Sequence, residues 1–158
     1  MATLQELLNS PNQSVRLKAA LAAGTYPNPD QIDILIVQCA SESDFFVRDT
    51  LSWALMRHDQ TSVVAQLKIE LKSENSQARS QALHTLSKIG DKENYTLITR
   101  DLLLDSDDFV ASTAWRSASV LVPDADKPAL VELLISQLGR GDSDTQFGLT
   151  RFLCAIGE

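Results

Sequence analysis

A few aromatic, acidic, basic and imidazole side chains, spaced by about one repeat length, are the residues best suited to recognise a ligand. Trp53, His84 and Arg116 follow one another at intervals of 84 - 53 = 31 and 116 - 84 = 32 residues. Asp49 precedes Trp53 by four residues, close to one helical turn. Aromatic and arginine side chains anchor many binding surfaces, and a histidine can carry a proton near neutral pH. These residue types therefore offer binding or proton transfer.

The spacing of reactive residues argues against catalysis. His84 has no histidine nearer than His58 and no serine or cysteine nucleophile set beside it. Cys39 and Cys154 lack CxxC spacing and a neighbouring histidine, so we expect both to be reduced core residues. The sequence also lacks phosphate-binding, dinucleotide, zinc-protease and calcium-loop motifs, and residues 139–142 are expected to form a turn. We predict a non-enzymatic protein without a metal site or a cofactor.

An internal repeat of about 32 residues positions these side chains. The position of Arg16 recurs at residues 48, 79, 111 and 147, with steps of 32, 31, 32 and 36 residues. The copies span residues 14–21, 46–53, 77–84, 108–115 and 145–152. Each follows a polar turn rich in Asn, Ser, Asp or Gly, residue types that cap the first free N–H groups of a helix. A helix is therefore expected to begin at every copy.

Hydrophobic periodicity predicts another helix before each of these turns, which is the first helix of each pair. Apolar residues recur at i, i+3, i+4 and i+7 from Ile32 to Cys39 and from Val131 to Leu138. Glycines and prolines stand where helices should end, and no alternating run predicts a strand. One helix pair cannot bury its own apolar stripe, so neighbouring pairs must stack. We predict a single all-α domain over residues 1–158, a right-handed α-α superhelix of about five helix pairs.

A helical wheel divides each second helix into a core stripe and an outward stripe. The core stripe contains Val47, Leu51 and Leu55; Ala78, Ala82, Leu86 and Ile89; and Val110, Ala114, Ala118 and Leu121. Trp115 is expected to be buried against a neighbour, and Ser80 to point outward. The outward stripe should line the concave side as a row. That row is predicted to contain the binding residues Leu21, Asp49, Trp53, His84, Arg116 and Phe152.

Other recurring charges have a structural interpretation. We expect Arg16, Arg48 and Arg79 to bond along the stack to aspartates of neighbouring turns, as a ladder and not as a phosphate site. Asp44, Asp107 and Asp108 are expected to be N-caps, because each stands at a predicted helix start.

The segments 47–55 and 78–90, with their Val-Arg and Ala-Arg second helices, resemble the HEAT repeat. More narrowly, the segments 44–55 and 78–90 resemble a bacterial family of small HEAT-repeat proteins without an assigned activity. The resemblance implies an armadillo-like scaffold that holds a protein or peptide on its concave face. Some HEAT-like folds instead remove alkylated bases from DNA. This leaves an alternative function, nucleic-acid binding or a DNA-glycosylase or lyase activity that uses Asp49 and Trp53.

Charge and hydropathy bear on the partner. The chain has 14 Lys and Arg against 21 Asp and Glu, a net charge of -7, and such a field repels a polyanion. A protein or peptide partner is therefore preferred to nucleic acid. The longest apolar runs, residues 34–37 and 102–104, are far shorter than a membrane-spanning helix. The first residues lack the basic and apolar pattern of a secretory signal, so a cytoplasmic location is expected.

Overall fold

The computed structural model describes residues 1–157, and within that range every regular element is helical. The α-helices are α1 (Leu4–Leu8), α2 (Gln13–Thr25), α3 (Ile32–Ser41), α4 (Phe45–Met56), α5 (Gln60–Glu70), α6 (Ser76–Ile89), α7 (Arg100–Leu103), α8 (Asp108–Leu121), α9 (Lys127–Ile135) and α10 (Ser143–Gly157). Three 3-10 segments are η1 (Pro29–Gln31), η2 (Lys92–Leu97) and η3 (Asp124–Asp126). Over these residues the helices form five pairs, so the predicted all-α repeat fold is confirmed. None of these helices combines the length and hydrophobicity needed to span a bilayer.

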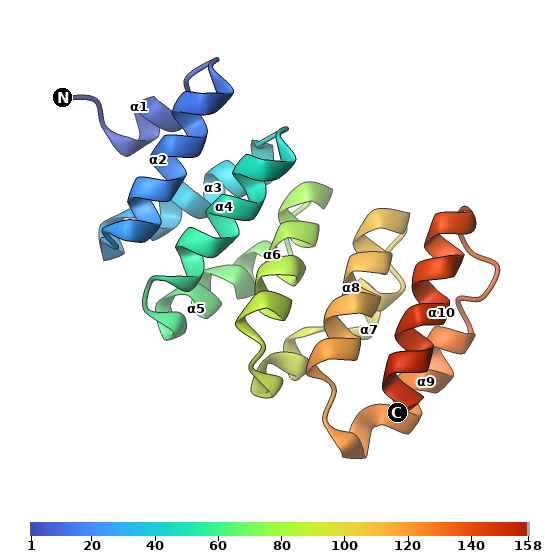
Figure 1. Ribbon diagram of the computed structural model, residues 1–158. Coiled ribbons are helices and arrows are strands. Elements are labelled where there is room, and N and C mark those ends of the chain that lie inside the picture. Colours follow the sequence, from blue (N-terminus) through green and yellow to red (C-terminus); the bar gives the residue numbers. More distant parts are fainter. Residues whose placement is uncertain (158) are drawn as a thin grey trace. The chain divides into compact units, whose positions relative to one another are not determined.

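The chain divides into two compact units, and the first comprises Met1–Lys88. In this unit the second helices α2, α4 and α6 run side by side, with α1, α3 and α5 behind them (Figure 1). The predicted core stripe of α4 is confirmed, because Val47, Leu51 and Leu55 are at most 1% exposed. A buried hydrogen bond of 3.1 Å between Ser52 Oγ and Thr85 Oγ1 joins α4 to α6. Unit 1 is thus a stack of three helix pairs.

The second unit, Ile89–Glu158, contains the remaining two pairs. Here α8 and α10 lie side by side, with α7 behind α8 and α9 behind α10 (Figure 1). The predicted core stripe of α8 is buried throughout, and Trp115 is 0% exposed. The Trp115 Nε1–H donates to the Leu103 carbonyl at 2.8 Å, so the burial predicted for this side chain is confirmed. The prediction of one domain over the whole chain stays a prediction.

Side-chain caps start the second helices, as the polar turns predicted. Asp44 Oδ1 accepts from the Val47 N–H at 3.0 Å, and this bond, the largest cause, lowers the pKa of Asp44. Asp107 Oδ1 accepts from the N–H groups of Phe109 and Val110. Asp108 is not a cap but the first helical residue of α8, and its carboxylate pairs with Arg140 at 2.8 Å. The expected cap role is therefore confirmed for Asp44 and Asp107 and wrong for Asp108.

The repeated arginines have a structural role, but their shared partner is a backbone carbonyl and not an aspartate. Arg16 Nη1 donates to the Ser10 carbonyl at 3.0 Å, and Arg48 Nη1 donates to the Glu42 carbonyl at 2.9 Å. Arg79 Nη1 donates likewise to the Ser73 carbonyl at 2.9 Å. Each arginine thus donates to a backbone carbonyl in the turn before its own helix.

The fourth copy replaces that arginine with Ala111, and its carbonyl is satisfied from a different place. The Arg140 guanidinium, which belongs to the turn before α10, donates from Nη2 to the Asp105 carbonyl. Since Asp105 stands two residues before its cap, as Glu42 and Ser73 do, the same position accepts the bond in both units. In the first four copies this carbonyl accepts from a guanidinium, and the sequence position that supplies the guanidinium changes in the fourth.

Unit 1 also encloses one carboxylate, that of Glu42. The Arg16 Nε lies 2.9 Å from Glu42 Oε2, and the Gln38 amide and the Asp44 N–H donate to the same carboxylate. Burial acts to raise the pKa of Glu42, but the hydrogen bonds from Arg16, Asp44 and Gln38 prevail and its pKa is lowered. The ionised Glu42 therefore links the turn before α4 to α2.

Candidate functional site

Counting from the N-caps places one outward position on the second helix of each pair. The caps Asn12, Asp44, Asn75, Asp107 and Asp142 hold backbone N–H groups of their own helices. The ninth residues after them are Leu21, Trp53, His84, Arg116 and Arg151. The first four were expected in this position. In the fifth copy the register differs by one residue from the expected one, so Arg151 occupies the equivalent place and Phe152, half-buried, is its neighbour.

Trp53 lies on α4 with its indole pressed against the backbone of α2. A Cβ built on Gly24 would lie 2.3 Å from Cζ3 of Trp53 and 2.8 Å from Cε3, closer than any real Cβ contact. Glycine is therefore the residue that lets the ring approach this far. The side chain keeps 40% of its surface exposed. Trp53 is a surface aromatic held in place by packing on one side.

Asp49 and His84 meet beside this ring. His84 Nε2 of α6 lies 3.6 Å from Asp49 Oδ1 of α4, and their side chains are 21% and 52% exposed. The distance is that of an ion pair when the imidazole is protonated and is longer than a normal hydrogen bond. Asp49 and Trp53 share one face of α4 because they are four residues apart. Unit 1 therefore brings three of the predicted site residues together, with Leu21 exposed on the adjacent α2.

The end of α4 is tied to α2 and to the segment that follows α2. Arg57 Nε donates to the Gly24 carbonyl at 3.2 Å. The buried ring of His58 contacts the Ala54 carbonyl through Nδ1 at 2.7 Å and accepts from the Asn28 N–H through Nε2 at 3.2 Å. These two bonds require a neutral ring with its proton on Nδ1. His58 is thus a structural link between α4 and the segment after α2. We do not include it with His84 among the candidate site residues.

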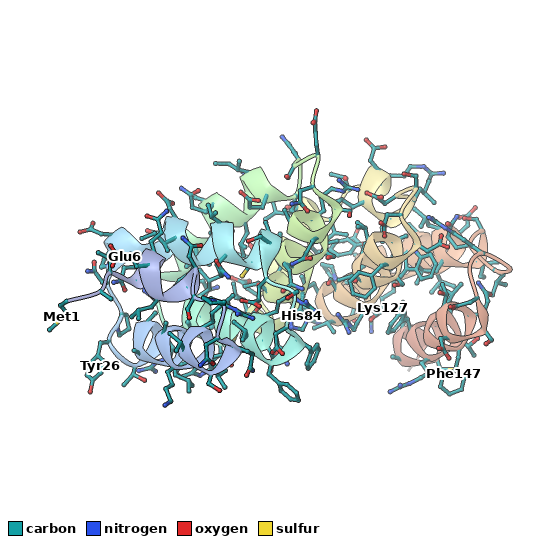
Figure 2. All side chains as sticks on the ribbon, turned by 90° about the horizontal axis from the view of Figure 1, so that it is seen from above. Met1, Glu6, Tyr26, His84, Lys127 and Phe147 are labelled. Carbon is teal, nitrogen blue, oxygen red and sulfur yellow. The ribbon has the colours of Figure 1, made fainter. Side chains whose placement is uncertain are left out.

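Unit 2 presents its own predicted site residues, Arg116 on α8 and Phe152 on α10. Arg116 is exposed, while Phe152 is half-buried with Gly148 of its own helix beneath its ring. A more prominent aromatic is Phe147, whose side chain points away from α10 as that of Tyr26 points away from the end of α2 (Figure 2). Cys154, expected in the core, is exposed, whereas Cys39 is buried and its burial raises its pKa to about 12.

The predicted outward stripe of α6 is wrong at Ser80. Ser80, expected to point outward, is 1% exposed and donates from Oγ to the Gln77 carbonyl at 3.1 Å. A small side chain on the boundary of the core stripe is readily covered by a neighbouring helix, which the wheel of a single helix does not include. Among residues 1–157 no three His, Cys, Asp or Glu side chains are placed to hold a metal ion.

Sequence analysis also missed a hollow on the side of the first helices. A depression of about 150 Å³ lies between α1 and α3. It is lined by Gln5, Leu8, Asn9, Asp33, Ile34, Val37 and Gln38. The available signal was Val37, which is exposed, together with Ile34, which is half-buried; both are apolar residues of α3 outside its buried stripe.

Comparison with known proteins supports a repeat fold. The family model for HEAT repeats matches residues 1–56. An engineered protein of known structure is 21% identical with a TM-score of 0.54, and the alignment covers 98% of this chain and 78% of the other. A second engineered protein is 22% identical with a TM-score of 0.54, over 98% of this chain and 47% of the other. This chain therefore spans about half the length of that second protein.

A designed armadillo repeat protein is 15% identical over 97% of this chain and 80% of its own, with a TM-score of 0.49. No curated protein matches the sequence. The narrower resemblance to a bacterial family of small proteins stays a prediction. The resemblance to HEAT repeats is confirmed: residues 1–56 match that family, and residues 1–157 have the all-α repeat fold it implies.

Proposed function

We propose that this chain is a non-enzymatic protein-binding module that holds a protein or peptide on the outward face of its second helices. The observation that carries the proposal is the environment of Trp53. Its large aromatic side chain is 40% exposed, although its ring packs on α2 where Gly24 leaves room for it. An indole immobilised before binding loses little conformational entropy when a partner covers it. Tryptophan is also among the residues most enriched at the energetic centre of interfaces.

The neighbours of Trp53 suit such a surface. Leu21 and Met56 are 45% and 42% exposed, which leaves apolar area beside the ring. Asp49 and His84 supply polar groups at its border. Apolar centres with polar borders are the usual composition of a protein interface. Arg116 and Phe152 in unit 2, which we propose as further contacts, would add a second patch.

The test is affinity capture from the native cell extract with the full chain and its variants. Trp53→Ala is expected to lose partners that the wild-type chain retains, and Arg116→Ala to weaken their capture. Ile69→Ala is a matched control, because Ile69 is an exposed apolar residue on α5, among the first helices of unit 1. Unchanged capture of every partner by the Trp53→Ala, Arg116→Ala double variant would contradict the proposal.

The same variants separate this function from binding to nucleic acid. Fluorescence anisotropy with duplex DNA at low salt should show no binding by the wild-type chain, because the net charge of -7 opposes it. Binding at low salt that is lost in Asp49→Asn and Trp53→Ala would instead support the nucleic-acid function.

A further inference from the structure

The surface around Trp53 has a direction, because its charges differ in sign on the two sides of the ring. Asp49 lies four residues before Trp53 on α4, and Arg57, the C-cap residue of α4 with helical φ and ψ, lies four residues after it. Residues four apart share one face of a helix, so the three side chains form a line along α4. We call Asp49, Trp53 and Arg57 the α4 line. It runs from an anion through an aromatic ring to a cation.

The anionic end of the α4 line keeps capacity for a further cation. The Asp49 side chain is 52% exposed, and its ion-pair contact is with the His84 imidazole at 3.6 Å through one oxygen, Oδ1. A carboxylate has two oxygens and about four acceptor positions. A Lys or Arg side chain arriving from a partner can therefore pair with Asp49 without displacing His84.

The ring at the centre of the α4 line offers apolar surface and also attracts a basic side chain that pairs with Asp49. The indole of Trp53 packs on Gly24 and keeps 40% of its surface exposed. The face of a tryptophan ring attracts Lys and Arg more strongly than that of any other residue. A basic side chain that reaches Asp49 lies within one helical turn of this ring, so both groups attract the same charge.

The cationic end is positioned by a hydrogen bond. Arg57 Nε donates to the Gly24 carbonyl at 3.2 Å, which holds the guanidinium beside the stretch of α2 that backs Trp53. A guanidinium carries five N–H donors, so one bond leaves others for a carboxylate of the partner. The charges of a partner at the two ends of the line must therefore be opposite in sign.

We propose, resting on the protein-binding function above, that the α4 line of unit 1 binds a peptide segment with a defined order of charge. The segment carries Lys or Arg opposite Asp49, an apolar or aromatic side chain on Trp53, and Asp or Glu opposite Arg57. Complementary charge fixes the orientation of the bound segment and disfavours segments with the reverse order. An all-acidic or all-basic partner fits one end and is repelled at the other.

The test uses a phage-displayed library of random peptides selected on the immobilised full chain, with counter-selection on Trp53→Ala. Peptides that depend on Trp53 are expected to be enriched in Lys or Arg over the unselected library. Synthetic versions are then titrated by fluorescence anisotropy. Asp49→Asn should weaken binding of these peptides about fivefold, and Asp49→Lys should weaken it further. Circular dichroism checks that each variant is folded.

Matched controls make the result specific to the α4 line. Asp101→Asn makes the same change at an exposed aspartate of α7 and should leave every affinity unchanged. Reversing the order of charges in a selected peptide at constant composition should reduce its affinity, and added salt should narrow the difference. Binders that depend on Trp53 but show no excess of basic residues, or that bind Asp49→Asn equally well, overturn the charge order while the protein-binding function stands. A failure to obtain any peptide that depends on Trp53 overturns both proposals.

Discussion

The two tryptophans occupy adjacent positions of the repeat unit, in its second and fourth copies, and have opposite environments. Trp53 is the ninth residue after the cap Asp44, and Trp115 is the eighth residue after the cap Asp107. One residue turns a helical side chain by about 100°. Trp115 is 0% exposed and Trp53 is 40% exposed. A single step of register thus separates a side chain that holds the fold together from one that is available to a partner.

The neighbours show how each unit adapts to its ring. Trp115 satisfies its Nε1–H with the Leu103 carbonyl of α7, as a buried indole must. Trp53 instead has a glycine beneath its ring, and polar side chains border it. Aromatic composition alone therefore does not distinguish core from surface in such repeats. The residues that pack against each ring decide whether it is buried or exposed.

The largest expected effect is that of removing the buried ring. Trp115→Ala should lower the free energy of unfolding by about 3–5 kcal/mol, because it leaves a cavity and an unpaired carbonyl at Leu103. Trp53→Ala should cost only about 1–2 kcal/mol, since much of its surface is already in water. Urea unfolding followed by circular dichroism measures both. Equal losses would contradict the division between the two rings.

The next effect concerns the buried carboxylate of unit 1. Glu42→Ala should lower the free energy of unfolding by about 3 kcal/mol at neutral pH, because it breaks the pair with Arg16 and leaves the Asp44 N–H without its acceptor. Urea unfolding at pH 7 measures the loss. Glu74→Gln, at an exposed glutamate, should have little effect in the same measurement.

This effect should depend on pH in a defined direction. The pKa of Glu42 is lowered in the folded chain. The ionised carboxylate therefore contributes its full stabilisation above the pKa of about 4.3 that glutamate has in an unfolded chain, and this stabilisation is lost as the pH falls through the lower pKa of the folded chain. The difference in stability between the wild-type chain and Glu42→Gln should therefore shrink below about pH 4. A difference that is constant from pH 7 to pH 3 would show that the carboxylate is not held ionised.

A smaller effect tests the contact that holds Trp53. Gly24→Ala should destabilise the wild-type chain by about 1 kcal/mol, because the overlap with the indole outweighs the higher helix propensity of alanine. In the Trp53→Ala background the same substitution should stabilise by about 0.5–1 kcal/mol, since the overlap is gone. Thermal or urea unfolding of the four proteins in this cycle measures the change of sign. The same sign in both backgrounds would mean that Gly24 does not accommodate the ring.

The smallest effect separates stability from binding at Asp49. Asp49→Asn should change the free energy of unfolding by less than about 0.5 kcal/mol, because an exposed ion pair contributes little. Urea unfolding gives the stability, and anisotropy with a selected peptide gives the affinity of the same preparation. A large loss of stability would place Asp49 with Trp115 as a structural residue.

Local patterns in the chain were enough to predict most of the helices and the core. Each cap acts on N–H groups two or three residues away, so Asp44 and Asp107 could be recognised without tertiary information. The core stripe follows from the helical period, and the residues of α4 and α8 confirm it. Ile89, half-buried at the end of α6, is a marginal member of that stripe.

The sequence by itself therefore determined the repeat, the all-α fold and the core stripes of α4 and α8, because these depend on interactions within about one helical turn. Tertiary structure alone decided which partners meet across helices: the glycine under Trp53, the contact of Asp49 with His84, and the hollow between α1 and α3. It also set Arg151 and not Phe152 at the ninth position of the fifth copy. Such contacts join residues about thirty positions apart, and their geometry follows from packing that no local pattern encodes.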